Sequence, residues 1–298
     1  MRRIPGPVLI ALATVLWGTT GTAQELAPDG ATPLTVGSLR LLVAAVALLV
    51  IAAATGQLHR IAGMRRPATL LAAAGVAAYQ PFFFLGVDRT GVVLGTIVAI
   101  GSAPVFAGLL AWGYDRTPPS RLWVGATVVG VAGITLLVSA GAEVGISVGG
   151  IGFALIAGAS YATYVIAARQ FSRAGQVIGP TAVIMAIAAV LLLPLLGTAD
   201  LAWVGTGAGT ATIMHLGILA TALAYLVFAT GLQGTRSTTA TTLTLGEPLT
   251  AAILGIIVVG ERPPLLGWAG FALVLAALAA AAAEGRSNRF FGPRRRPV

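Results

Sequence analysis

Long apolar segments recur along the whole chain, and the polar interruptions between them are short. An α-helix needs about 20 mostly apolar residues to cross the hydrocarbon core of a bilayer. By this measure the pattern predicts ten membrane-spanning helices and leaves no space for a soluble domain between them. The predicted spans are Pro7–Gln24, Thr32–Ala54, Pro67–Val87, Gly91–Gly113, Arg121–Ser139, Gly149–Ala168, Gly179–Gly197, Gly209–Gly231, Ser237–Val259 and Leu265–Ala283.

The composition supports an all-α integral membrane protein. Hydrophobic residues make up 57% of the 298 residues and charged residues only 9%, and the mean hydropathy is +0.94. Soluble domains carry about 25% charged residues. Cysteine is absent, which excludes disulfides and thiolate metal sites. The sequence also contains no metal-ligand cluster and no phosphate-binding glycine loop, so we expect no cofactor and no coupling to ATP.

The basic residues separate to one side once the spans are laid out in alternation. All 18 of them are arginines. The side of the N-terminus collects Arg2, Arg3, Arg60, Arg65, Arg66, Arg116, Arg121, Arg169, Arg173, Arg236, Arg286, Arg289, Arg294, Arg295 and Arg296. The opposite side holds Arg89 and Arg262. The positive-inside rule therefore predicts a multi-pass membrane protein with both termini in the cytoplasm.

This separation also explains the net charge of +9. Arginines at the cytoplasmic ends of helices set topology and meet anionic lipid headgroups. We therefore predict contact with the lipid bilayer and no nucleic-acid partner. The sequence leaves open whether the protein is a monomer or a homodimer.

The two halves of the chain resemble each other at a constant offset. "AIGSAPVFAGLLAW" (99–112) aligns with "LTLGEPLTAAILGI" (243–256), which places Pro104 over Pro248, and "ATVLWGT" (13–19) aligns with "AGASYAT" (157–163), which places Trp17 over Tyr161. Each half contains five spans, an odd number, so the second half enters the membrane from the opposite side. We predict a first repeat at 1–140, a second, inverted repeat at 145–285 and a basic cytoplasmic tail at 286–298.

Glu247 and Pro248 interrupt the apolar span Ser237–Val259. A charge at the centre of a bilayer costs on the order of 3 kcal/mol or more, so this carboxylate must face protein or water. A proline removes a backbone donor, and the freed carbonyls near Thr244 and Ile100 are tolerated at membrane depth where they line a cavity. Pro104 and Pro248 are therefore candidate hinges. Glu247 could exchange a proton for substrate, pair with a substrate ammonium, or brace the bend; the residues alone do not choose among these roles.

Aromatic and hydroxyl side chains near the centres of several spans are candidates for a polar pocket. Tyrosine and tryptophan usually gather at the membrane interface, so central ones need polar partners or a cavity. Together with Glu247, the candidate substrate-binding residues are Trp17, Tyr79, Phe83, Ser102, Tyr161, Tyr164, Tyr225 and Thr244. The rings could hold an ammonium by cation–π attraction. Ordinary helix packing, with hydroxyls bonded back to their own helix, is the alternative for each.

Two further polar residues have less specific expectations. His215, near the outer end of its span, is expected to be an interfacial hydrogen-bonding residue, with a gating contact as the alternative. Arg40, about two turns into the second span, is expected to reach the membrane surface or to pair with an acid such as Glu25.

The ten-span duplication, the "LWG" at 16–18, the proline of the fourth span and the "GEP" at 246–248 resemble the EamA family of the drug/metabolite transporter superfamily. The resemblance covers essentially the whole chain. Within the family the sequence is similar to the bacterial amino-acid exporters of the YddG type. The resemblance implies an export carrier of the bacterial inner membrane, not an enzyme, with a central cavity lined by spans one, three, four, six, eight and nine.

These features predict a secondary transporter that exports amino acids, aromatic or broad-range ones included, or related small metabolites by alternating access. The alternatives are a drug or other metabolite transporter of the same superfamily and, with less support, a channel or a membrane scaffold. An integral-membrane enzyme would need several acids, histidines or a nucleophile–base pair at one depth. Glu247 and His215 alone do not provide them.

Overall fold

The computed structural model describes residues 4–57, 66–115, 119–139, 147–197, 199–260 and 264–287, and these residues contain helices and no strand. The predicted tail at 286–298 lies outside the described residues from Asn288 on. The helices are α1 Gly6–Glu25, α2 Pro33–Ala54, α3 Arg66–Asp115, α4 Arg121–Ser139, α5 Val148–Arg173, α6 Ile178–Leu192, α7 Gly207–Met214, α8 Ala224–Leu232, α9 Ser237–Leu243, α10 Gly246–Leu254 and α11 Leu265–Ser287.

These helices form the ten predicted spans. Helix α3 covers two of them, because Gly91 leaves the helical conformation with a φ of 80° and turns the chain back on itself. One span combines α7, the π-helical segment His215–Leu223 and α8, and another combines α9, α10 and the π-helical segment Gly255–Val259. Nine helices of the described chain are long and apolar enough to cross a membrane, and Arg121–Leu137 is a shorter apolar helix. The fold class predicted from the sequence is confirmed.

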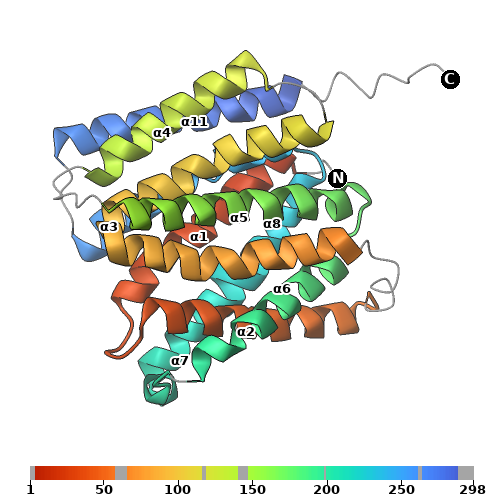
Figure 1. Ribbon diagram of the computed structural model, residues 1–298, viewed down its shortest axis with the longest axis vertical. Helices are drawn as coiled ribbons and strands as arrows, with labels where there is room; N and C mark the ends of the chain where they lie inside the picture. The colour runs from red at the N-terminus through yellow and green to blue at the C-terminus, as the bar shows by residue number, and fades with distance from the viewer. Residues whose placement is uncertain are drawn as a thin grey trace.

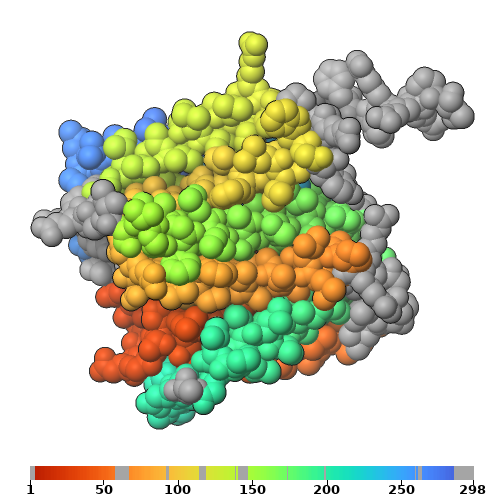
Figure 2. Space-filling view, in the orientation of Figure 1, coloured from red at the N-terminus to blue at the C-terminus, as the bar shows by residue number. Residues whose placement is uncertain are grey.

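The spans run alongside one another and reverse direction at each connection (Figure 1). Helix α1 begins, and α11 ends, at the same end of the bundle, on the right of that view. We call this the N-terminal end, and the end where α1 finishes the opposite end. Figure 2 shows one broad face, where the first limb of α3 lies between α5 and α6 along the molecule. Helices α4 and α11 form a pair at the edge of the bundle (Figure 1).

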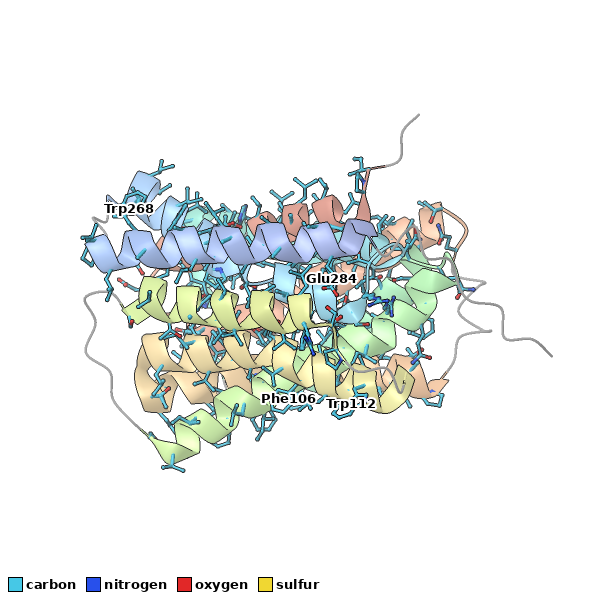
Figure 3. All side chains as sticks on the ribbon, turned by 90° about the horizontal axis from the view of Figure 1, so that it is seen from above. Phe106, Trp112, Trp268 and Glu284 are labelled. Carbon is cyan, nitrogen blue, oxygen red and sulfur yellow. The ribbon has the colours of Figure 1, made fainter. Side chains whose placement is uncertain are left out.

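Two tryptophans mark the ends of the bundle. Trp112 and Trp268 lie toward opposite ends of it (Figure 3), and 52% and 51% of their surfaces are exposed. This is the arrangement of interfacial aromatic residues in a membrane protein. Trp123 and Trp203, by contrast, are buried against neighbouring helices.

Glycines allow the helices to approach closely. A Cβ atom on Gly133 would lie 2.8 Å from the backbone nitrogen of Val274, and one on Gly270 would lie 2.5 Å from the backbone nitrogen of Leu137. Helices α4 and α11 therefore touch backbone to backbone. In a membrane, where lipid is as apolar as leucine, such close packing is a main source of helix association.

A polar contact closes the α4–α11 pair at the N-terminal end. The Ser120 hydroxyl donates to the carboxylate of the buried Glu284 (Figure 3) and accepts from the backbone N–H of Trp123, in the first turn of α4. Ser120 therefore caps α4 and also gives the buried carboxylate a hydrogen-bond donor.

Replacing Ser120 by alanine is expected to lower the free energy of unfolding by about 2 kcal/mol, because the variant loses the helix cap and a hydrogen bond to a buried carboxylate. Reversible unfolding in mixed detergent micelles measures this change. Ser147→Ala is the matched control, since Ser147 caps α5 through the N–H of Gly150 and has no carboxylate partner among the hydrogen bonds described. An equal loss in the two variants would show that the Glu284 contact contributes nothing.

Candidate functional site

A cavity of about 90 Å³ lies inside the bundle. Its lining residues come from α1, α2, both limbs of α3, α5, α8, the break between α9 and α10, and α10 itself, and include a glutamate, an arginine, two glutamines and several aromatic rings. They are Trp17, Thr20, Gln24, Arg40, Tyr79, Gln80, Phe83, Phe84, Ala99, Ile100, Ala103, Tyr161, Tyr225, Thr244 and Glu247. Seven of the nine candidate binding residues from the sequence are among them.

The cavity extends from the middle of the membrane toward the opposite end. Glu247, at its deep side, is near the centre of the span Ser237–Val258. Gln24 lies in the last turn of α1 and Arg40 about 10 Å along α2 from Pro33, both toward the opposite end. On the other side of the cavity, Tyr164, Phe228, Leu232 and Leu243 are buried. The cavity is thus separated from the N-terminal end by packed side chains.

The break between α9 and α10 places Glu247 at the cavity. The α-helix ends at Leu243 and restarts at Gly246, so Thr244 and Leu245 lie between two helices at membrane depth. The Thr244 hydroxyl bonds the carbonyl of Thr241, one turn back, which competes with regular helical bonding. Irregular backbone at this depth occurs where it lines a cavity, and Thr244 is a lining residue.

Burial disfavours the charged form of the Glu247 carboxylate, and two features of its surroundings offset part of this cost. Glu247 belongs to the first turn of α10, where the partial positive charge of the helix N-terminus attracts an anion. The guanidinium of Arg40 adds an attractive electrostatic interaction from α2. Helix α1 approaches closely here, because a Cβ atom on Gly18 would overlap Thr250 and lie 2.9 Å from the carbonyl oxygen of Glu247. The glycine of the "LWG" motif therefore lets Trp17 and Glu247 face the same cavity.

Aromatic rings from four spans meet around and beneath the cavity. The Trp17 ring centroid lies 5.2 Å from those of Tyr225 and Phe228 and 6.2 Å from that of Tyr161. Tyr79 lies 5.9 Å from Tyr161 and stacks on Phe83 at 5.6 Å. Most of these pairs are tilted or edge-to-face, as the quadrupoles of aromatic rings favour. We call Trp17, Tyr79, Phe83, Tyr161, Tyr164, Tyr225 and Phe228 the aromatic cluster.

Two polar atoms that belong to lining residues are buried without a hydrogen-bond partner in the described part of the chain. They are the hydroxyl of Tyr161 and Nε of Arg40. Leaving such a group unpaired costs about 1–3 kcal/mol, and more when the group is charged. Both atoms belong to residues that line the same cavity, so a bound molecule could supply the missing partners after a small rotation of either side chain.

Comparison with known proteins agrees with this architecture. The model of the EamA-like transporter family matches residues 4–139 and again residues 148–282. The chain belongs to the EamA-like transporter family. This membership establishes a multi-pass membrane transporter and confirms the family predicted from the sequence.

Relatives of this EamA-like transporter are named as transporters. The uncharacterized transporter YwfM of Bacillus subtilis is 40% identical over 95% of both chains. The threonine/homoserine exporter RhtA of Escherichia coli K12 is 30% identical, over 85% of this chain and 82% of RhtA. A solved crystal structure aligns with 95% of this chain and 98% of its own length at a TM-score of 0.80. Because the sequence identity is only 20%, this similarity shows the fold alone.

Some predicted site residues of this EamA-like transporter do not reach the cavity. Ser102 bonds back to the carbonyl of Ala99 and packs against α5, where a Cβ atom on Gly158 would overlap its hydroxyl. Tyr164 is 2% exposed and lies beneath the cavity, within the aromatic cluster. Both residues have the expected depth, but their side chains point elsewhere.

The two prolines also differ from each other in a way that the sequence did not predict. Gly91 is where α3 departs from helical φ/ψ, so the helix passes Pro104 without a break. Near Pro248 the predicted break exists, but the carbonyl of Thr244 is not free, because it accepts from the N–H of Glu247 at 3.0 Å. This bond reaches back three residues instead of the four of an α-helix, so the chain makes a tighter turn just before the proline. Both prolines lie outside the cavity lining.

Arg40 is the main lining residue that was not among the predicted site residues. The sequence predicts that Arg40 reaches the membrane surface or pairs with an acid such as Glu25. In the structure its Nε is buried and its side chain lines the cavity, where it interacts electrostatically with a different acid, Glu247. One turn earlier on α2, a Cβ atom on Gly37 would lie 2.9 Å from the side-chain oxygen of Gln80. Gly37 and Arg40 share a face, which is the face that α2 turns toward α3. The three-residue spacing of Gly37 and Arg40, which puts them on one helix face, is the sequence feature that could have indicated the direction of the Arg40 side chain.

His215 makes a contact between helices at the opposite end. Its Nε2 lies 2.9 Å from the hydroxyl of Thr19, and His215 begins the π-helical segment of its span. π-Helical turns are rare and are frequent at functional sites. The hydrogen bond agrees with the hydrogen-bonding role that the sequence predicts for His215. The alternative, a gating contact, stays a prediction; the next residue on α1, Thr20, lines the cavity.

Replacing Tyr161 by phenylalanine is expected to separate stability from function. Because the hydroxyl is buried and unpartnered, its loss should leave the unfolding free energy unchanged or raise it by about 1 kcal/mol. If a substrate pairs with the hydroxyl, its affinity should fall roughly tenfold. Thermal unfolding and calorimetric titration measure the two quantities, and Tyr164→Phe, beneath the cavity, is the control. Unchanged affinity in Tyr161→Phe would remove this hydroxyl from the site.

Proposed function

We propose that this EamA-like transporter is a secondary carrier that exports amino acids or related small metabolites from the cytoplasm by alternating access. One observation carries the proposal: a cavity at mid-membrane depth contains Glu247, a charged side chain that would be costly in lipid, at a helix break. Transporters place substrate sites at such discontinuous helices. The relationship to a threonine/homoserine exporter supports export and an amino-acid substrate.

The size and chemistry of the cavity favour small substrates. At about 90 Å³ it is well below the roughly 300–1,000 Å³ of pockets that hold drug-sized ligands. Its polar residues include one acid and one arginine, which suit a molecule with charged groups better than an apolar drug. The surrounding rings can add cation–π attraction to an ammonium group.

The predicted topology gives the cavity an orientation relative to the two sides of the membrane. If arginine-rich connections mark the cytoplasm, both termini are cytoplasmic. A related transporter, YicL of Salmonella typhimurium, 24% identical over 92% of this chain, is named as an inner membrane protein, and we assign this chain to the same membrane. The described cavity then lies toward the outer side of the membrane, and the packed end is cytoplasmic. An outward-facing cavity is the state from which an exporter would release its substrate.

The two matches of the family model support the proposed division into repeats at 1–140 and 145–285. Residues of both halves line the cavity, Trp17 and Tyr79 from the first and Tyr161 and Glu247 from the second. In an inverted duplication the closed cytoplasmic end and the outward cavity would exchange roles when the halves rock. The break at Thr244–Leu245 is the proposed site of bending, whereas Pro104 lies in continuous helix.

Purified protein in liposomes tests the function. Vesicles loaded with one labelled amino acid at a time should exchange it with external unlabelled amino acid at carrier rates, and empty liposomes should not. Flux far above carrier rates would indicate a channel, and no flux of any amino acid would overturn the proposed substrate class. Drugs and other metabolites would then be the next substrates to test.

A further inference from the structure

We propose that Arg40 and Glu247 bind the two ends of a zwitterionic substrate, with the carboxylate on Arg40 and the ammonium on Glu247. The inference rests on the proposed function and names its substrate class, which is α-amino acids with both the amino and the carboxyl group free. It assigns Arg40, on the second span, a role in substrate binding.

The first observation is the state of Arg40. Its Nε is buried and has no hydrogen-bond partner in the described part of the chain, and its side chain lines the cavity. A guanidinium carries five donors in a planar fork that matches a carboxylate with two parallel hydrogen bonds. An arginine about two turns inside a membrane helix, with an unsatisfied donor at a cavity, is thus a ready site for a carboxylate.

The second observation is that Arg40 and Glu247 face one cavity without touching. Arg40 acts electrostatically on Glu247, but among the described residues the two form no direct ion pair or hydrogen bond with each other. Opposite charges at this depth attract strongly, so a gap between them needs an explanation. A molecule with one positive and one negative end fills the gap and satisfies both groups.

The third observation fixes the direction of the substrate. Arg40 lies toward the opposite end, with the polar residues Thr20, Gln24 and Gln80 also in the lining, whereas Glu247 lies at mid-depth. Trp17 and Tyr161 are lining residues that contact each other edge-to-face. The rings favour a cation, and the orphan hydroxyl of Tyr161 can accept from it. The ammonium therefore points into the bundle and the carboxylate toward the opposite end.

The test compares substrates that lack one charge. Alanine, threonine, leucine and phenylalanine, each with its amide and its N-acetyl derivative, are titrated into the purified protein and used for exchange in liposomes. The wild-type protein should bind at least one free amino acid roughly tenfold or more tightly than its amide, which lacks the negative charge, and than its N-acetyl form, which lacks the positive charge.

Arg40 variants then locate the carboxylate. Arg40→Gln should weaken binding of the free amino acid roughly 10- to 100-fold and leave binding of the amide unchanged, so that the preference for the acid disappears. Arg40→Lys should restore part of it, since lysine keeps the charge and loses the fork. Arg89→Gln is the control: Arg89 lies over the ring of Phe153, 4.8 Å from its centroid, and does not line the cavity.

The outcomes are distinct. If wild type exchanges amino acids but treats them and their amides alike, or if Arg40→Gln keeps the wild-type preference, the charge clamp is wrong and the transport function stands. An Arg40 that only stabilised the bundle would lower binding of acid and amide by the same factor. If none of the four amino acids binds or exchanges, the clamp and the proposed substrate class both fail. Even if Arg40→Gln does not fold, the comparison of ligands on the wild-type protein can overturn the charge clamp.

Discussion

Glu247→Gln is expected to reduce amino-acid exchange in liposomes roughly 100-fold. Glutamine keeps the shape of the side chain, so the helix break and the approach of α1 at Gly18 should remain. The variant loses the negative charge in the first turn of α10, and Arg40 then faces the cavity without a counter-charge. A substrate ammonium would lose its partner, which lowers exchange. Loss of a titratable group from a proton-coupled carrier would instead lower net efflux and preserve exchange.

Rates at equal amounts of folded, membrane-inserted protein provide the measurement. Glu25→Gln is the matched control, because Glu25 ends α1 at the opposite end of the bundle and does not line the cavity. Comparison of exchange with net efflux along a proton gradient separates the two roles. Loss of both processes indicates substrate binding, whereas loss of net efflux with exchange preserved indicates proton coupling. Wild-type behaviour in both assays would remove Glu247 from the mechanism.

Gly6→Val is expected to slow transport roughly 10- to 100-fold without preventing insertion. A Cβ atom on Gly6 would lie 2.5 Å from the carbonyl oxygen of Gly231 and 2.5 Å from the hydroxyl of Thr235. The start of α1 and the end of α8 therefore touch directly at the N-terminal end, and Arg169 holds the carbonyl of Thr235 beside them. Valine cannot fit there, so the variant should favour states in which this end is open.

The absence of cysteine makes this shift measurable. A single Thr20→Cys substitution places one thiol in the cavity wall, and an impermeant maleimide added from the side of the opposite end should label it more slowly in Gly6→Val than in the Thr20→Cys parent. Gly21→Val is the control on the same helix, since a Cβ atom there meets nothing within 4 Å. Equal labelling and equal transport in Gly6→Val would show that closure at Gly6 and Gly231 is not part of the cycle.

The fold could be predicted from the sequence because bilayer thickness imposes one length on every span. Even the tight turn between the third and fourth spans falls where Gly91 offers a positive φ. The sequence does not show that two prolines in aligned positions have different effects on their helices, and their role as hinges stays a prediction. In the later span, Gly246 and hydroxyls that bond back to the helix accompany the proline, and the helix breaks. Around Pro104 the helix continues.

The sequence predicts how deep in the membrane each candidate site residue lies, but it does not predict whether the side chain points toward the cavity. Hydropathy shows how far a residue lies along a span, and Trp17, Tyr79 and Glu247 were found on that basis. The face that a helix turns inward depends on its neighbours. The sequence therefore assigns Ser102 and Tyr164 to the cavity, and Arg40 to the membrane surface or to a pair with an acid such as Glu25, because it does not show how α2, α3 and α5 pack. A pair such as Gly37 and Arg40, one turn apart, carries this directional information.

The aromatic cluster has a consequence for the membrane as a whole. Tyr164 and Phe228 are almost completely buried, and their rings, together with Trp17 and Tyr225, fill the space beneath the cavity. Among the described residues these rings form a hydrophobic plug between the cavity and the N-terminal end. We expect such a plug to limit the leak of protons and ions through the protein, so that a membrane with many copies keeps its voltage.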